Sequence, residues 1–262
     1  MNSGAERRIS EPLKMYQETE LQNASVLAMM VGLAIPQDEK DEFLEKLEKA
    51  QYEGRGSKRL QLICEKISEL PNLSTFDQFI LEMSFCRSVD NFLTYISDML
   101  TLLFVTKKNY LTRFSKSVDT DLIVEKDNVN EIIHEIVERE VMSLSHRNIK
   151  DLSKFLGQKD KLKIKMFKDE AFLDAVSTFV EIRNLMVHNR GYITRSALKR
   201  SRGLRNLGAP AGSKPRLTGE FMTWVNHILP LAAIHFEDVM CKKFGLPQLH
   251  DFNDEQTEQS EA

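Results

Sequence analysis

The chain has 262 residues, 42% hydrophobic and 29% charged, which is enough to bury one sizeable core without disulfides. Its three cysteines, Cys64, Cys86 and Cys241, lie far apart and form no Cys-x-x-Cys pair, which argues against a zinc site and predicts a reducing, cytoplasmic setting. Residues 1–12 carry charges without a following apolar core, and the longest apolar stretches fall short of the roughly 20 residues of a spanning helix, so neither a secretory signal nor membrane insertion is expected.

Glycine and proline are scarce, and apolar residues recur at helical spacing, which predicts an all-α fold. Residues 15–35 and 38–52 are predicted to form two helices separated at Pro36, and residues 57–70 a third that stops before Pro71. Together, residues 1–70 make an N-terminal helical segment.

The next element is a long helix over residues 74–105, whose apolar residues recur at steps of three and four and which should form the spine of a domain over residues 71–247. Two shorter helices are predicted over residues 129–144 and 149–156. Gly157 stands where a left-handed residue would cap the second of them.

Residues 166–188 carry a continuous apolar stripe and are predicted to form a helix that is broken at Gly191. Residues 195–217 are rich in Gly, Ser, Pro, Arg and Lys and are too long and polar for an ordinary connection, so they are either functional or disordered. Residues 219–244 return to helix, almost apolar all round and hence buried. The acidic tail, residues 248–262, is expected to be unstructured.

Positive charge is concentrated in one part of the chain. Residues 182–219 contain nine Lys/Arg and no Asp or Glu, whereas the whole chain has a net charge of −3, which leaves −12 for the remaining residues. A basic concentration of this kind in an acidic protein indicates a binding site for a polyanion, because bound phosphates gain Coulombic attraction and release counterions.

Arg183 opens this basic stretch. It follows Phe179 by four residues and precedes Val187 by four, which places it on or beside the apolar stripe of its own helix. A cation in that position calls for an anion. Two interpretations stay open: Arg183 binds an RNA phosphate, or it pairs with a carboxylate such as Asp90 or Glu82.

Asn184 and His188 are four residues apart and share a helix face, and the longer side chain of Arg183 can bend toward them, so the three can converge on one phosphate. Alternatively, His188 is a capping or surface group stabilised by the helix dipole. Arg139 and His146 show a similarly loose spacing, but three neighbouring glutamates would repel phosphate there.

The sequence Arg183-Asn184, followed after three residues by His188 and then by Asn189-Arg190-Gly191 at the end of a late helix, resembles the signature of the HEPN superfamily, in particular its RNase-like branches. The resemblance covers residues 74–244. Within it, SFCRSVDNFLTYISDML and EIVEREVMSLSHRNIKDLSKFLG are similar to the ribosome-linked HEPN group. Residues 1–70 lie outside it.

The resemblance implies a HEPN-like helical bundle that acts as a homodimeric, metal-independent endoribonuclease without a cofactor. Arg183 and His188 would be catalytic and Asn184 a polar helper, in a cleft shared by two protomers. The 2'-hydroxyl of RNA would attack the adjacent phosphate, which requires a base, an acid and a cation for the crowded phosphorane. Families with this signature commonly serve as toxins or antiviral defence effectors, so an antitoxin or a defence-system partner protein is also implied.

RNA binding would fall to basic side chains of the same stretch, with Tyr192 available to stack on an unpaired base. The basic residues are Arg190, Arg195, Lys199, Arg200, Arg202 and Arg205. A solvated, disordered basic loop is the alternative to this interpretation. Two further hypotheses are a non-catalytic HEPN-like module that binds nucleic acid or a partner, and a helical scaffold in which Arg183 is a buried ion-pair residue.

Overall fold

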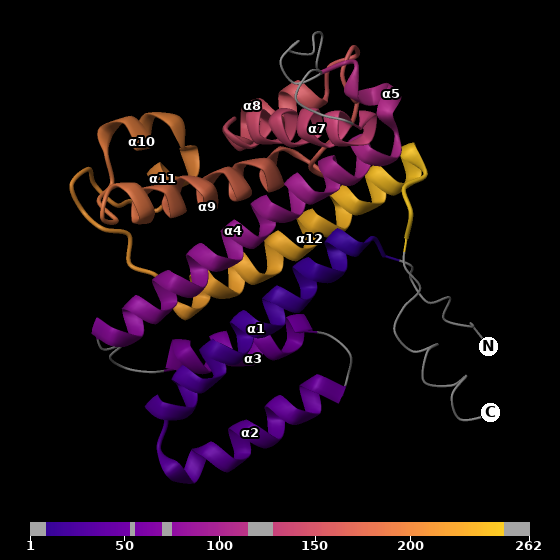
Figure 1. Ribbon diagram of the computed structural model, residues 1–262. Helices are drawn as coiled ribbons and strands as arrows, with labels where there is room; N and C mark the ends of the chain where they lie inside the picture. Colours follow the sequence, from indigo (N-terminus) through magenta and orange to yellow (C-terminus); the bar gives the residue numbers. More distant parts are fainter. Residues whose placement is uncertain (1–8, 53–55, 70–74, 115–127, 249–262) are drawn as a thin grey trace, which may run out of the picture.

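A computed structural model describes residues 9–52, 56–69, 75–114 and 128–248, and these residues form helices and no β-strand (Figure 1). The prediction of an all-α fold is confirmed. Residues 249–262 of the expected unstructured tail lie outside the described residues. The helices are α1 (Glu11–Ala34), α2 (Gln37–Tyr52), α3 (Gly56–Glu69), α4 (Thr75–Thr106), α5 (Lys108–Leu111), α7 (Val129–Ser145), α8 (Ile149–Leu156), α9 (Glu170–His188), α10 (Arg195–Arg200), α11 (Arg202–Asn206) and α12 (Gly219–Phe244).

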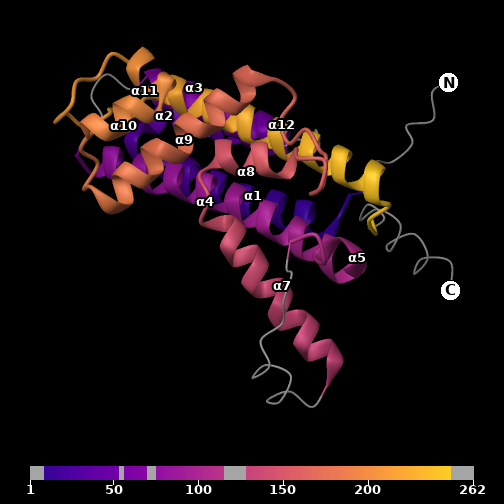
Figure 2. The same ribbon diagram turned by 90° about the horizontal axis from the view of Figure 1, so that it is seen from above.

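The long helices α4 and α12 run side by side through the middle of the bundle, with α1 and α3 packed on one side and α9 on the other (Figure 1). The aromatic side chains of Phe85, Phe92, Tyr95 and Phe104 on α4 are fully buried, so α4 is the spine that its apolar spacing predicts. Helix α7 contacts α4 at one end and extends away from the other helices (Figure 2). None of the described helices is long and apolar enough to cross a membrane.

The ends of the helices follow local capping chemistry. Ser10, Asp169 and Thr218 each accept a hydrogen bond from a backbone N–H in the first turn of the helix that follows. Because Asp169 is the cap, α9 begins at Glu170 and not at residue 166 as the apolar stripe predicts. The left-handed conformation expected for Gly157 is wrong: its φ is −72° and the helix ends there in a right-handed turn.

The N-terminal helices share one core with the later helices, and two buried polar networks hold them there. Glu237 of α12 accepts hydrogen bonds from the backbone N and the Oγ of Ser10, at 2.6 and 2.7 Å, and from the Tyr95 hydroxyl at 3.3 Å. Glu20 of α1 accepts from the Ser88 hydroxyl at 3.1 Å and from the Asn91 amide at 2.9 Å. Buried carboxylates need such donors, and these networks fix α1 against α4 and α12.

Candidate functional site

The candidate site lies at the C-terminal end of α9. Phe179, Ile182 and Leu185 are buried, and α9 packs against α4 and α12. The backbone N–H groups of Asn189 and Gly191 both donate to the Leu185 carbonyl at 2.9 Å and close the helix. Gly191 has a φ of +81°, which glycine adopts without steric cost, so the predicted break at Gly191 is confirmed.

Arg183 is a partly buried side chain, and its anion is provided by the spine helix. Its Nε lies 2.6 Å from Oδ1 of Asp90 on α4, and its Nη1 donates to Oδ1 of Asn184 at 3.0 Å. The buried Nε–H makes no hydrogen bond, so its contact with Asp90 is an ion pair whose N–H direction misses the oxygen. The structure therefore brings Arg183 and Asn184 together, and Asp90 is the partner among the two carboxylates that the sequence offered.

His188 is the last residue of α9 and is exposed. Its ring makes no hydrogen bond and no ion pair with any described residue. Arg183 and Asn184 lie nearer to the core, whereas His188 and its neighbours Val187, Asn189 and Arg190 face solvent. The helix thus ends in an imidazole that is open to solvent.

The basic stretch that follows is folded onto α9. Ile193 exchanges backbone hydrogen bonds with the other end of the stretch: its N–H donates to Ser213 and its carbonyl accepts from Gly212, both at 2.8 Å. Gly203 on α11 lies directly against Thr178 of α9, because a Cβ built on Gly203 would fall 1.9 Å from the Thr178 Oγ1. The stretch is folded over α10 and α11, which argues against the disordered interpretation, and its functional interpretation stays a prediction.

Two of the basic side chains are engaged within the protein. Arg200 donates to Glu181 of α9 at 2.5 Å and to the Ser196 hydroxyl at 2.6 Å. Arg205 donates to the backbone carbonyl of Leu198 at 2.6 Å, at the C-terminal end of α10. Both side chains therefore hold α10 in place, and their charges are partly satisfied before any ligand arrives.

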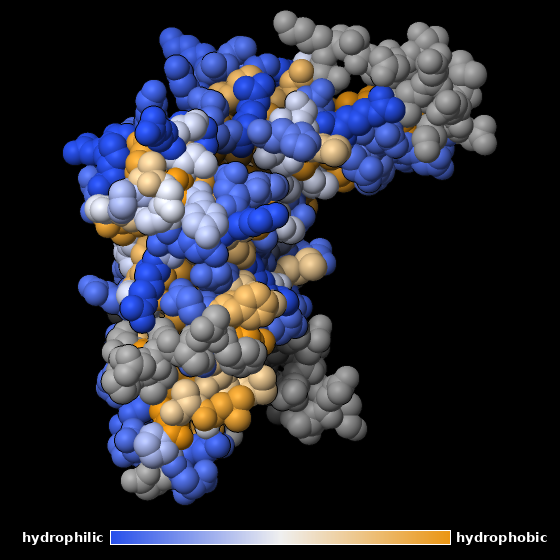
Figure 3. Space-filling model, turned by 90° about the vertical axis from the view of Figure 1, so that its left-hand side faces the viewer, coloured by the Kyte–Doolittle hydropathy of each residue, from blue (hydrophilic) through white to orange (hydrophobic). Residues whose placement is uncertain are grey.

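The other predicted binding residues point into solvent. Arg190, Arg195, Lys199 and Arg202 are exposed, and none of their side chains makes a hydrogen bond or an ion pair with a described residue. Tyr192 is half exposed, and the Lys214 ammonium lies 5.0 Å from the centre of its ring. The space-filling view toward this end of the molecule shows a largely hydrophilic surface over the upper part, with hydrophobic residues gathered lower down (Figure 3).

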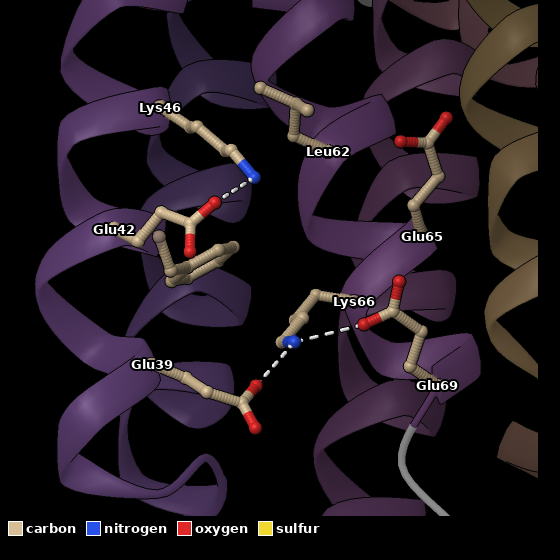
Figure 4. Close-up of a pocket in the computed structure, with 8 residues that line it drawn as sticks. Glu39, Glu42, Lys46, Leu62, Glu65, Lys66 and Glu69 are labelled. Atoms are coloured by element: carbon tan, nitrogen blue, oxygen red, sulfur yellow. Dashed lines mark hydrogen bonds and ion pairs between the residues drawn. The ribbon is translucent and has the colours of Figure 1, made fainter.

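Two hollows elsewhere have a different character. One, of about 260 Å³, lies between α2 and α3 and is lined mainly by glutamates and by Lys46 and Lys66 (Figure 4). There Lys66 pairs with Glu39 at 2.6 Å and with Glu69 at 2.9 Å. The other, of about 720 Å³, is open and lies between α3 and α12, beside Trp224 and three glutamates. Their carboxylates disfavour an anionic ligand, and neither hollow includes Arg183 or His188.

The three cysteine thiols are expected to be unreactive. Burial raises the pKa of the Cys64 and Cys86 thiols to about 11 and that of Cys241 to about 12. These thiols are protonated near neutral pH and are poor nucleophiles. Within the described part of the chain, no group of three or more His, Cys, Asp or Glu side chains is arranged to hold a metal ion.

Comparison with known proteins gave no relative: no protein-family model, no curated protein and no solved structure matches the chain significantly.

Several contacts at the site were not predicted from the sequence. The pairing of Arg200 with Glu181 spans 19 residues, and the Lys214 contact with Tyr192 spans 22. Glu181 is the last acid before the basic stretch, and that position was the only local signal that it could neutralise one of the arginines. The packing of Gly203 had no signal in the sequence, because a glycine in a polar stretch is equally typical of a turn.

Proposed function

We propose that the protein is a metal-independent endoribonuclease of the HEPN type, in which Arg183 and His188 act on a single RNA phosphate and Asn184 orients Arg183. The observation that carries the proposal is the contact between Arg183 and Asn184, one turn before an uncommitted histidine and beside an ordered basic surface. A fixed guanidinium suits the non-bridging oxygens of a phosphorane, and an imidazole suits proton transfer near neutral pH.

The ion pair with Asp90 limits which nitrogens of Arg183 can contact a phosphate. Its Nε faces a carboxylate and its Nη1 donates to Asn184, while Nη2 donates no hydrogen bond within the described residues. A phosphate that approaches from solvent would therefore meet Nη2 first. Asp90 and Asn184 hold the guanidinium plane in place, so Arg183 need not lose side-chain freedom when RNA binds.

Two histidines are needed because one imidazole cannot be base and acid in the same step, and each chain supplies one at this site. We therefore propose a homodimer in which the ends of two α9 helices face each other. Helices α4 and α9 are antiparallel, since Arg183 meets Asp90 and Met186 meets Cys86. Phe79 and Met83 precede Cys86 on α4 and therefore lie toward the C-terminal end of α9. Their side chains are both 54% exposed, and that of Val187 on α9 is 51% exposed. These apolar side chains are suited to a protomer contact.

RNA would be the substrate, and the biological role would be that of a toxin or an antiviral defence effector whose partner is an antitoxin or another defence protein. The test is a short pulse of expression followed by sequencing of cellular RNA ends. Wild type should create new ends at defined sites, and His188→Ala should create none. His188 is the better probe, because it is exposed and its loss leaves packing intact, whereas Arg183→Ala also removes the partner of Asp90.

His146→Ala is the matched control, since His146 is an exposed histidine at the C-terminal end of the glutamate-containing helix α7. It should leave the pattern of RNA ends unchanged. New ends that persist in His188→Ala would overturn the assignment of the chemistry.

The second candidate function is a non-catalytic module that binds RNA or a partner protein. The Asp90–Arg183 ion pair favours it, because a cation that already has an anion can be purely structural. In that case wild type and His188→Ala would give identical RNA ends, and purified protein would bind RNA without cutting it.

A further inference from the structure

The cations of the basic surface fall into two groups that the sequence does not separate. Arg200 and Arg205 are engaged with Glu181, Ser196 and the end of α10. The side chains of Arg195, Lys199 and Arg202 are exposed and have no partner among the described residues. A free guanidinium or ammonium can contact a phosphate without breaking an existing contact, whereas an engaged one must first lose its partner. Arg190 is a fourth free cation, next to His188 at the end of α9, and the three on α10 and α11 are the free cations that extend the basic surface away from it.

The three side chains, called the track below, come from two consecutive short helices, α10 and α11. Arg195 and Lys199 are four residues apart on α10, which places them on one helix face with Cβ atoms about 5–6 Å apart. Arg202 is the first residue of α11, directly after Ser201, whose side chain accepts a hydrogen bond from the Leu204 N–H and begins that helix. The track is rigid, because the close approach of Gly203 to Thr178 and the hydrogen bonds of Ile193 anchor both ends of the stretch on α9.

Along the chain, Tyr192 lies between the end of α9 and the first residue of this track. Its ring is 49% exposed, and the Lys214 ammonium is 5.0 Å from its centre, so the ring has support from one side chain and open surface beside it. A half-exposed, supported aromatic ring can stack on a base that is not already stacked in a duplex. Sequence-tolerant stacking next to a row of free cations is the arrangement that proteins use for single strands.

We propose that this surface binds an unpaired RNA strand, with phosphates on Arg195, Lys199 and Arg202 and a base on Tyr192, while Arg200 and Arg205 only hold the surface together. The inference rests on the proposed function and narrows its substrate to single-stranded RNA. The strand leads from α11 and α10 past Tyr192 to His188, so cleavage falls next to the stacked base.

The test measures binding in the full-length His188→Ala protein, which does not cut the probe. A labelled 12-nucleotide unstructured RNA is titrated by fluorescence anisotropy at salt concentrations from about 50 to 300 mM, a range over which phosphate contacts weaken markedly. Arg195→Ala, Lys199→Ala and Arg202→Ala should each lower the slope of log affinity against log salt by about 0.7, the value for one phosphate contact of a single strand.

Lys242→Ala is the matched control, because Lys242 is an exposed lysine in the last turn of α12, away from the track. It should leave the slope unchanged, whereas Arg200→Gln, which loses a contact within the protein and no phosphate contact, should lower the slope less than the three track variants do. Tyr192→Ala should weaken binding about tenfold, whereas Tyr192→Phe should not, since stacking needs the ring alone. A duplex of the same sequence should bind more weakly than the single strand.

The inference is overturned if the three track variants keep the full salt slope, if Arg200→Gln lowers it as much as they do, or if the duplex binds more tightly. Cleavage by wild type is measured separately. If the RNA ends depend on His188 but the track variants keep the full salt slope, the proposed binding surface is wrong and the proposed nuclease activity stands. If the track variants show the expected slopes but wild type does not cleave RNA, the proposed nuclease activity is wrong and the proposed binding surface stands.

Discussion

Replacing Gly203 by alanine tests whether the basic surface is fixed to α9. The new methyl group would lie 1.9 Å from the Thr178 Oγ1 and 2.8 Å from its Cβ and Cγ2, which is closer than real Cβ contacts. Thr178 is 1% exposed and its hydroxyl donates to the Asp174 carbonyl at 2.7 Å, so it cannot turn aside freely. Overpacking of this kind typically lowers the free energy of unfolding by about 1–3 kcal/mol. Alanine in a helix is more stabilising than glycine by about 1 kcal/mol, which offsets part of this loss.

We expect Gly203→Ala to lose about 1 kcal/mol of unfolding free energy in urea denaturation, together with RNA affinity, although no charge changes. Thr178→Ala removes the closest clash, so in a double-mutant cycle the two changes should couple by at least about 1 kcal/mol. Gly157→Ala is the control, because Gly157 has a right-handed φ of −72° and its neighbours lie at an ordinary 3.4 Å. An unchanged urea midpoint in Gly203→Ala, without coupling, would refute the contact.

Three other predictions concern stability and reactivity. Arg183→Met and Asp90→Asn should couple by about 1 kcal/mol in a cycle of unfolding free energies, since the pair is partly exposed and screened; purely additive effects would mean that the ion pair does not form in solution. Burial raises the pKa of Glu20, so its carboxyl binds a proton more tightly in the folded protein than in the unfolded chain. The ionised carboxylate therefore lowers the stability of the fold above the unfolded pKa of about 4.3. Glu20→Gln should therefore be more stable than wild type at pH 7 in urea titrations, with the advantage gone below pH 4, and an advantage independent of pH would contradict this. The pKa values of about 11 for Cys86 and about 12 for Cys241 predict alkylation by iodoacetamide at pH 8 more than about 100-fold slower than for a free thiol, as followed by mass spectrometry, and rapid labelling would refute them.

Most of the helices follow from local signals. Pro36 separates the first two helices, and the long apolar repeat after residue 74 becomes α4 with its ends displaced by one residue. Such features are readable because capping residues, proline and the 3.6-residue period act over a few neighbours. Gly157 shows the limit: a glycine at a helix end permits a left-handed turn without requiring it.

The site was less accessible to prediction, because its contacts join residues far apart in the chain. The position of Arg183 beside the apolar stripe predicted that it needs an anion, and Asp90 was one of two carboxylates that the spine helix offered. The division between engaged and free arginines was not predictable, since it depends on Glu181 and on the fold of α10 against α9. The sequence therefore located the basic surface, and the structure shows which of its charges remain available.

The most direct measurement is the chemistry of the RNA ends that purified full-length protein leaves in EDTA. A metal-independent attack by the 2'-hydroxyl predicts 2',3'-cyclic phosphates and free 5'-hydroxyls, formed by wild type and by His146→Ala and abolished in His188→Gln. Ends with 5'-phosphates, cleavage that stops on chelation of metal, or a His188→Gln protein as active as wild type would contradict the assignment of His188 as the proton-transfer group.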